Sequence, residues 1–149
     1  MRIDAHHHVW TVARGDYGWL DRAPEAIRRD FDLADLGPFL ARHAIAATIL
    51  VQAAPTVAET RFLLATARQS GVVAGVVGWA DLLAEDAEAT IDRLADDPLL
   101  VGLRPMVQDL PDDDFLLDPR LVRALNAMVR RNLVFDALVL PRHLSRLLV

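Results

Sequence analysis

Five short segments rich in β-branched and other apolar residues are spaced along the chain, and each is predicted to be a strand. These segments are Arg2–His7, Ala47–Gln52, Val72–Trp79, Leu99–Arg104 and Leu133–Leu140. Helical patterns lie between them, because apolar residues recur there at intervals of three and four positions. Strands that alternate with helices along a chain form a parallel sheet. The pattern therefore predicts an α/β protein built from five βα units.

The helical segments also carry residues that are typical of helix ends. Thr56 and Glu59 form a capping-box pattern, in which Thr56 caps the helix and Glu59 reaches back to the Thr56 backbone. We expect this helix to run toward Gly71. Asp118 and Pro119 predict an N-cap followed by proline at the first helical position. The apolar stripe expected of that helix consists of Leu121, Val122, Leu125, Met128 and Val129. Two further helices are expected over Leu33–His43 and Ala87–Ala95.

The first strand carries an unusual run of polar residues in the sequence "MRIDAHHHVW". Side chains alternate between the two faces of a strand, so Asp4, His6 and His8 are predicted to share one face while His7 points to the other. Two histidines side by side can share one metal ion or one substrate group. Hydrogen-bonded structural histidines are the alternative interpretation.

A long loop is expected between this first strand and the first helix. The segment Thr11–Phe31 has no strong helical or strand pattern, and it carries Tyr17 and Trp19. Loops of this length are uncommon in compact domains and often lie over a binding site. Trp10, just before the loop, is expected to be the lid of the site on the first strand.

The other predicted strands also carry polar or aromatic residues near their carboxyl ends. These residues are Gln52, Trp79, Asp81, Arg104 and Gln108, and the fifth predicted strand contains Asp136 among apolar neighbours. A length of 149 residues suits a five-stranded doubly wound sheet, whereas an eight-stranded barrel needs about 250 residues. A doubly wound sheet, however, gathers its ligand groups at one switch point, and a barrel collects them from every strand. The distribution therefore favours a TIM-type (β/α)₈ barrel, of which this chain carries about the first five βα units.

Each candidate residue also has a structural interpretation. Gln52 can cap backbone groups at the end of a strand, and Trp79 can form part of the wall. Arg104 and Asp136 can form an ion pair across neighbouring strands, because buried charges need partners whatever their role. Residues expected to be solvated or to lie at helix ends are Asp112–Asp114, His43 and His143.

The composition narrows the classes of function. Hydrophobic residues make up 53% of the chain, which is enough for the core of one domain. The net charge of −5 argues against nucleic acid or an anionic membrane as partner and leaves a small molecule. The chain has no cysteine, so a metal would depend on histidine and carboxylate ligands. No segment approaches the ~18 apolar residues of a membrane span, and the first residues do not resemble a signal peptide. A cytoplasmic protein is therefore expected.

Several motifs together resemble the amidohydrolase-related family. They are "IDAHHHVW", "ILVQA", "VVGWADL", "GLRPMVQDLPDDDFLLDP" and "LVFDALVLPRHL", and they follow one another in the family's order over essentially the whole chain. The D-x-H-x-H opening is moderately specific by itself, and the G-L-R-P and F-D-x-L-V segments make the match strong. The resemblance is greatest to the branch of sugar lactonases, such as fuconolactonase, and of pyrone dicarboxylate lactonase.

This resemblance implies a (β/α)₈ barrel that opens a lactone by water attack. His6 and His8 would be ligands of one divalent ion, most readily zinc, together with a histidine on the sixth strand and an aspartate on the eighth that acts as base. A metal-independent reaction stays open, because some lactonases of the branch are thought to need no metal. Arg104 would hold substrate oxygens or a carboxylate, a task that suits its planar guanidinium. The other candidate substrate-binding residues are Gln52, Trp79, Asp136 and Trp10.

The sequence stops at Val149, before the sixth strand of such a barrel. We therefore expect residues 1–149 to be the N-terminal portion of a single barrel domain, inactive alone because the later histidine and aspartate are absent, so no catalytic base is assigned. The alternative is a non-catalytic half that binds a small molecule or metal and assembles with a partner chain. Unpaired edge strands predict self-association or pairing with a chain that completes the barrel.

Overall fold

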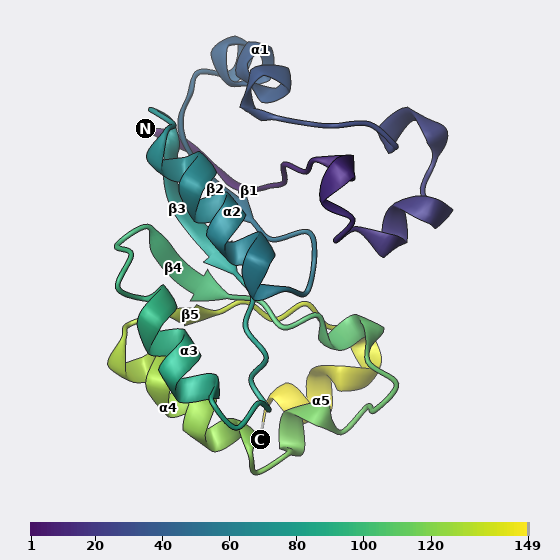
Figure 1. Cartoon of the computed structure of the whole chain (residues 1–149), viewed down its shortest axis with the longest axis vertical. Coiled ribbons are helices and arrows are strands. Elements are labelled where there is room, and N and C mark those ends of the chain that lie inside the picture. Colours follow the sequence, from purple (N-terminus) through teal and green to yellow (C-terminus); the bar gives the residue numbers. More distant parts are fainter. Residues whose placement is uncertain (149) are drawn as a thin grey trace.

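The five strands lie side by side in the order in which they occur along the chain, as the computed structural model of the protein shows for residues 1–148 (Figure 1). The strands are β1 (Arg2–His7), β2 (Ile45–Val51), β3 (Val73–Gly78), β4 (Leu100–Leu103) and β5 (Val134–Phe135). Every neighbouring pair is parallel. A doubly wound sheet would place β1 inside the sheet, whereas a barrel wall adds strands in sequence. The order confirms the predicted first five units of a barrel.

Helices connect the strands and cover one side of the curved sheet. They are α1 (Leu33–His43), α2 (Val57–Arg68), α3 (Ala87–Leu94) and α4 (Leu121–Arg130). The short α5 (Leu144–Leu147) follows β5 and connects no strands within residues 1–148. α2 ends three residues before Gly71, because the backbone N–H of Gln69 already closes its last turn on Ala67 and Thr66.

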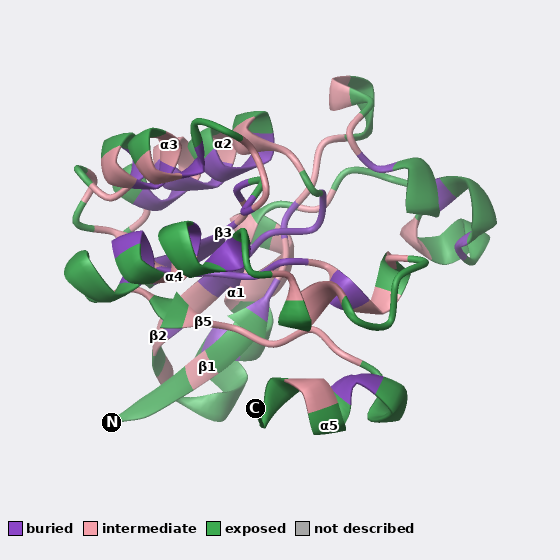
Figure 2. Ribbon diagram, turned by 90° about the horizontal axis from the view of Figure 1, so that it is seen from below, coloured by how far each residue is buried: buried purple, intermediate pink, exposed green. Residues whose placement is uncertain are grey.

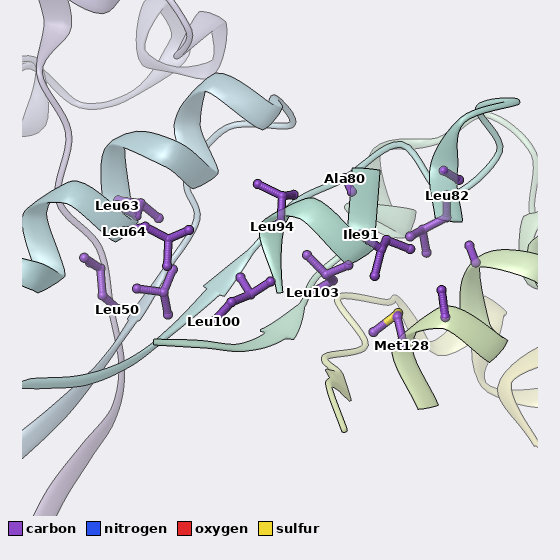
Figure 3. Packing of buried hydrophobic residues seen from close by; sticks show 14 of the residues in the cluster. Leu50, Leu63, Leu64, Ala80, Leu82, Ile91, Leu94, Leu100, Leu103 and Met128 are labelled. Atoms are coloured by element: carbon purple, nitrogen blue, oxygen red, sulfur yellow. The ribbon is translucent and has the colours of Figure 1, made fainter. Parts of the chain in front are cut away.

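The hydrophobic core lies between these helices and the sheet. Leu63 and Leu64 of α2 pack toward Leu50 of β2, and the core continues along the sheet beneath α3 and α4 (Figure 3). The labelled residues in the further part of this core are Ala80, Leu82, Ile91, Leu94, Leu100, Leu103 and Met128. Two members of the predicted α4 stripe do not take part, since Val122 and Val129 are exposed. Ala124 and Ala127 are buried instead, because they lie on the face of α4 that meets the core.

The sheet has two open edges. β1 and β5 are the outermost strands, and within residues 1–148 no further strand pairs with either of them. Most of β1 is exposed, as its green ribbon shows in Figure 2. Ile3 on one edge and Val134 on the other are large apolar residues that stand largely in solvent.

The fifth strand is much shorter than predicted. The apolar run Leu133–Leu140 suggested a full strand, yet only Val134 and Phe135 pair with β4. Beyond them the chain turns to the segment after β4, where the Leu138 carbonyl accepts a hydrogen bond of 3.0 Å from the Gln108 backbone. A run of apolar residues indicates that a segment is buried. Contacts with a loop can bury a segment as well as pairing in a sheet can.

The capping box at α2 forms only in part. Thr56 caps the helix as predicted, with its side-chain oxygen 2.9 Å from the Glu59 backbone nitrogen. Glu59 does not reach back to the Thr56 backbone, because that N–H is already bonded to the Ala54 carbonyl at 3.0 Å. The Glu59 carboxylate turns into the protein and is fully buried.

One prediction of a solvated residue is wrong. His143 is fully buried, and its Nδ1 accepts a hydrogen bond of 3.0 Å from the Leu140 backbone. Asp113 is exposed, as predicted, but it pairs with Arg142 at 2.6 Å and lies 3.3 Å from the His143 ring. The Asp112–Asp114 run therefore joins the segment after β4 to the end of the chain. Across the described part of the chain, no helix combines the length and apolar character needed to cross a bilayer.

Candidate functional site

His6 and His8 face each other at the carboxyl end of β1. Their Nε2 atoms lie 3.1 Å apart, and their ring planes cross at 85°. Residues two apart in a strand point to the same side, which explains why these rings meet. Asp4 was predicted to share their face, and its Oδ1 accepts a hydrogen bond of 3.2 Å from the His6 backbone N–H. The structure thus brings together the two histidines that were predicted to be metal ligands.

Backbone contacts fix the orientation of His8. Its Nδ1 lies 2.8 Å from the Val51 carbonyl oxygen. A carbonyl can only accept, so Nδ1 carries the proton and Nε2 keeps a free lone pair directed at His6. Burial lowers the pKa of His8 to about 4, so the ring is neutral near pH 7. His7 points to the opposite face and binds the Thr48 hydroxyl at 2.9 Å.

Arg104 brings a buried positive charge to the same place. It follows β4, is 5% exposed, and its Nη1 lies 3.4 Å from His6 Nε2. Burial lowers the pKa of Arg104, and the nearby charges of Asp136 and Asp109 act in the opposite direction. No carboxylate within residues 1–148 lies within 4.0 Å of the guanidinium, so the suggested ion pair with Asp136 does not form. Asp136 lies beyond the paired residues of β5, and its backbone bonds to Leu103 at 3.0 Å.

Gln52 and Arg104 are joined by two hydrogen bonds at the ends of β2 and β4. The Gln52 side chain donates a hydrogen bond of 2.9 Å to the Arg104 carbonyl, and Arg104 Nη2 donates to the Gln52 carbonyl. Two atoms of this pair, Gln52 Oε1 and Arg104 Nε, are buried without a partner among the described residues. A buried polar atom without a partner costs about 1–3 kcal/mol. The Gln52–Arg104 pair therefore leaves hydrogen-bonding groups next to His6 that the described residues do not satisfy.

The loop after β1 is an ordered wall beside this cluster. It contains three short 3₁₀ helices, at Val12–Arg14, Gly18–Arg22 and Glu25–Ile27. Trp10 packs edge-on against Trp19, with ring centroids 5.4 Å apart. The Trp10 indole donates to the Arg29 carbonyl at 2.7 Å, and the Trp19 indole to the Ala53 carbonyl at 2.8 Å.

Sequence reasoning missed the buried group that ties this loop to the sheet. The Tyr17 hydroxyl donates a hydrogen bond of 2.7 Å to Glu59 Oε2, and Arg14 Nη2 lies 3.6 Å from the same oxygen. Glu59 Oε1 accepts a hydrogen bond of 3.2 Å from the Ala53 backbone N–H. Burial raises the pKa values of both Glu59 and Tyr17. Sequence periodicity gives no sign of this contact, because a long loop has no fixed period.

A cavity of about 780 Å³ lies next to the cluster, at the ends of β3 and β4. Trp79 lies on its wall, which is where the structure places this predicted substrate-binding residue. His6, His8 and Arg104 do not line the cavity, whereas Pro105 and Met106, directly after Arg104, do. The other lining residues include the aromatic Trp19 and Phe115 and the acidic Asp16, Asp81, Asp109 and Asp112.

The histidine pair suits a divalent ion but does not complete its coordination. Zinc–nitrogen bonds are about 2.0–2.1 Å long, so two nitrogens on one ion can stand at the separation seen between His6 and His8. Catalytic zinc takes three protein ligands. Within residues 1–148, no group of three or more His, Cys, Asp or Glu side chains is arranged to hold a metal ion.

Two curated relatives match nearly the whole chain. An L-fucono-1,5-lactonase of Burkholderia ambifaria is 51% identical over 148 residues, which are 99% of this chain and 51% of the relative. An L-fucono-1,5-lactonase of Burkholderia multivorans is 34% identical over 147 residues, which are 97% of this chain and 49% of the relative. The chain therefore spans about half the length of the curated relatives it matches.

Solved structures give the same picture of the fold. A crystal structure of an amidohydrolase from Burkholderia multivorans with bound zinc superposes with a TM-score of 0.88 at 33% identity. The match covers 99% of this chain and 52% of that protein. The profile of the amidohydrolase family Amidohydro_2 matches residues 3–149. The chain belongs to this family of amidohydrolases.

Proposed function

We propose that the protein is a lactone hydrolase, and that this chain supplies its substrate-orienting arginine and two ligands of a divalent ion. The observation that carries the proposal is Arg104, which is buried without a carboxylate partner and lies 3.4 Å from His6. A buried guanidinium without a counter-ion favours a ligand rich in oxygen. The identity of 51% with an L-fucono-1,5-lactonase supports a sugar lactone as the substrate.

The chemistry of lactone opening matches these groups. Water adds to the ring carbonyl, the bond from the carbonyl carbon to the ring oxygen breaks, and a carboxylate and a hydroxyl group result. Negative charge develops on the carbonyl oxygen during the addition, and donors that already point at this position stabilise it. The guanidinium of Arg104, which lies 3.4 Å from His6, would supply such donors. The carboxylate of the product would also suit the guanidinium.

The proposed ion is zinc, held by His6 and His8 together with ligands from outside the described residues. When bound, such an ion lowers the pKa of water and polarises a carbonyl. The neutral state of His8 supports this role, because its free Nε2 lone pair is the group that binds a metal. A zinc-bound structural relative at 33% identity also supports it. The cytoplasmic location expected from the sequence stays a prediction.

The direct test is hydrolysis of L-fucono-1,5-lactone by the protein that carries this chain. Acid release with a pH indicator follows the opening of the ring. We expect opening faster than the spontaneous reaction, and loss of the acceleration in a His6→Ala variant. A rate equal to that in buffer alone would refute the proposal.

A second measurement decides whether the metal takes part. Zinc content per chain is measured for the wild type and for two variants. His6→Ala should lose the bound zinc, whereas His43→Ala should keep it, because His43 lies at the exposed end of α1. Equal loss in both variants would show nonspecific binding at the surface. If a chelator leaves the rate of lactone hydrolysis unchanged, the reaction does not need a metal.

A further inference from the structure

We propose that Glu59 is a positioning residue that orients Arg104 through a single peptide unit. The inference rests on the proposed function, because it assigns a purpose to the orientation of Arg104. Glu59 lies in the first turn of α2 and does not contact the histidine pair. Its effect on the site passes through the chain that follows β2.

The peptide unit between Gln52 and Ala53 joins the two side chains. Its N–H belongs to Ala53 and donates to Glu59 Oε1 at 3.2 Å. Its carbonyl belongs to Gln52 and accepts from Arg104 Nη2. A trans peptide is planar, so its N–H and its C=O point in opposite directions and turn together. An acceptor that fixes the N–H therefore fixes the carbonyl that receives the guanidinium.

The carboxylate of Glu59 is itself held in one position. It is fully buried, and the Tyr17 hydroxyl donates to it at 2.7 Å. Arg14 lies 3.6 Å from the same carboxylate and covers the ring of Phe62 at 4.4 Å. Burying a carboxylate costs free energy unless several donors surround it. α2 does not need Glu59 as a cap, because Thr56 already fills that role.

The same stretch of backbone orients two more side chains of the site. Three consecutive carbonyl groups, those of residues 51, 52 and 53, accept hydrogen bonds from the side chains of His8, Arg104 and Trp19, in that order. The backbone N–H bound by Glu59 lies between the second and the third of these carbonyls. A change at Glu59 should therefore move Arg104 and Trp19 together.

The test compares variants that differ in one contact each. Glu59→Ala removes the acceptor of the Ala53 N–H, whereas Glu59→Gln keeps an oxygen that can accept it. Tyr17→Phe keeps the packing of the ring and removes only the donor that holds Glu59. Ile91→Val is the matched control, because Ile91 is fully buried in α3 and does not contact this stretch. This control should lower stability without changing the site.

The measurement is the position of two resonances in ¹⁵N-labelled protein. They are the indole N–H of Trp19 and the buried Nε–H of Arg104, identified with Trp19→Phe and Arg104→Lys. Thermal melting of each variant is recorded beside them. We expect Glu59→Ala and Tyr17→Phe to shift both resonances, Glu59→Gln to return them toward the wild-type positions, and Ile91→Val to leave them in place.

Unchanged resonances in Glu59→Ala, with a lower melting temperature, would show a purely structural role and overturn the inference. If Glu59→Ala does not fold, the Tyr17→Phe variant is used instead, and unchanged resonances in it would overturn the inference in the same way. The resonances do not depend on turnover, so a failure of the proposed function leaves this test intact. If the lactone is hydrolysed, Tyr17→Phe should also raise KM several-fold, because a displaced Arg104 holds the substrate less well. An unchanged KM would likewise overturn the inference.

Discussion

Arg104 illustrates how single residues determine the chemistry of the site. Its guanidinium is buried, contacts His6 and the Gln52 carbonyl, and forms no ion pair within residues 1–148. A protein that only needed stability at this position could use an apolar side chain, since burying a charge carries a penalty. The proposed ligand would supply the partner that this charge lacks within residues 1–148.

The planar guanidinium of Arg104 gives the first prediction for a single residue. Arg104→Lys keeps the charge and removes the planar fork with its several donors. A lost hydrogen bond to a charged group is worth about 1.5–3 kcal/mol, so kcat/KM for the lactone should fall about tenfold or more. Steady-state kinetics measure the change. Arg130→Lys is the control, because Arg130 is exposed and paired with Glu88. Equal kinetics in both variants would leave Arg104 with a structural role only.

The second prediction concerns the effect of pH through Glu59. Burial raises the pKa of Glu59, so the folded protein holds this proton more tightly than the unfolded chain does. Its contribution to stability is therefore complete below the unfolded pKa of about 4.5 and is lost as the pH rises through the raised value. Glu59→Gln has no such proton. Its melting temperature, relative to wild type, should rise as the pH goes from acid to neutral. Parallel curves for the two proteins would contradict this account.

Strand geometry explains which of these residues could be predicted from sequence. The two-residue period predicted that His6 and His8 share one side while His7 faces the other, and the structure has this arrangement. The contact between Glu59 and Tyr17 could not be predicted, because it joins a helix to a loop across 42 residues. Burial of His143 was missed for a similar reason, since it depends on the fold of the segment after β4.

At the scale of elements, the cap of α2 was easier to predict than the end of β5. The Thr56 cap is a contact within four residues, so the sequence contains all of it. The end of β5 depends on where the neighbouring segment runs, and the Leu138 carbonyl bonds to Gln108 instead of continuing the sheet. Alternation of apolar residues could not distinguish these two outcomes.

The cap of α2 gives the prediction at this scale. Thr56→Ala removes the side-chain acceptor of the Glu59 backbone N–H. The free energy of unfolding should fall by about 1 kcal/mol, as is typical of a lost N-cap. Denaturant titration measures the change. Thr66→Ala, in the last turn of the same helix, should be neutral or slightly stabilising, because alanine favours helices. An equal loss in both variants would mean that the cap contributes nothing of its own.

At the scale of the whole molecule, the open sheet is the feature with the largest consequence. β1 and β5 end the sheet, and apolar residues such as Ile3 and Val134 are exposed on them. Edge strands with unpaired backbone groups favour pairing with another chain. The alternation of strands and helices was enough to predict consecutive parallel strands, whereas no pattern in the sequence predicts what pairs with these edges.

The two open edges of the sheet predict that the chain associates with another chain. The net free energy of unfolding of a domain is ~5–15 kcal/mol. Apolar surface that stays exposed loses about 25 cal/mol of stabilisation per Å². Several hundred Å² of such surface therefore matter to whether residues 1–149 persist alone. Light scattering after size exclusion should show self-association of the purified chain, or a complex when a chain with the remaining barrel units is present. A cooperatively melting monomer of 16.5 kDa would contradict the prediction.

We propose that one site at the carboxyl ends of β1 and β4 holds both metal and substrate. The most direct measurement is anomalous X-ray diffraction from crystals of the protein that carries this chain, grown with zinc and L-fuconate, the acid formed when the lactone opens. We predict an anomalous peak about 2.0–2.1 Å from Nε2 of both His6 and His8, with the carboxylate of L-fuconate on Arg104. Zinc at other residues, or L-fuconate bound away from Arg104, would contradict the account.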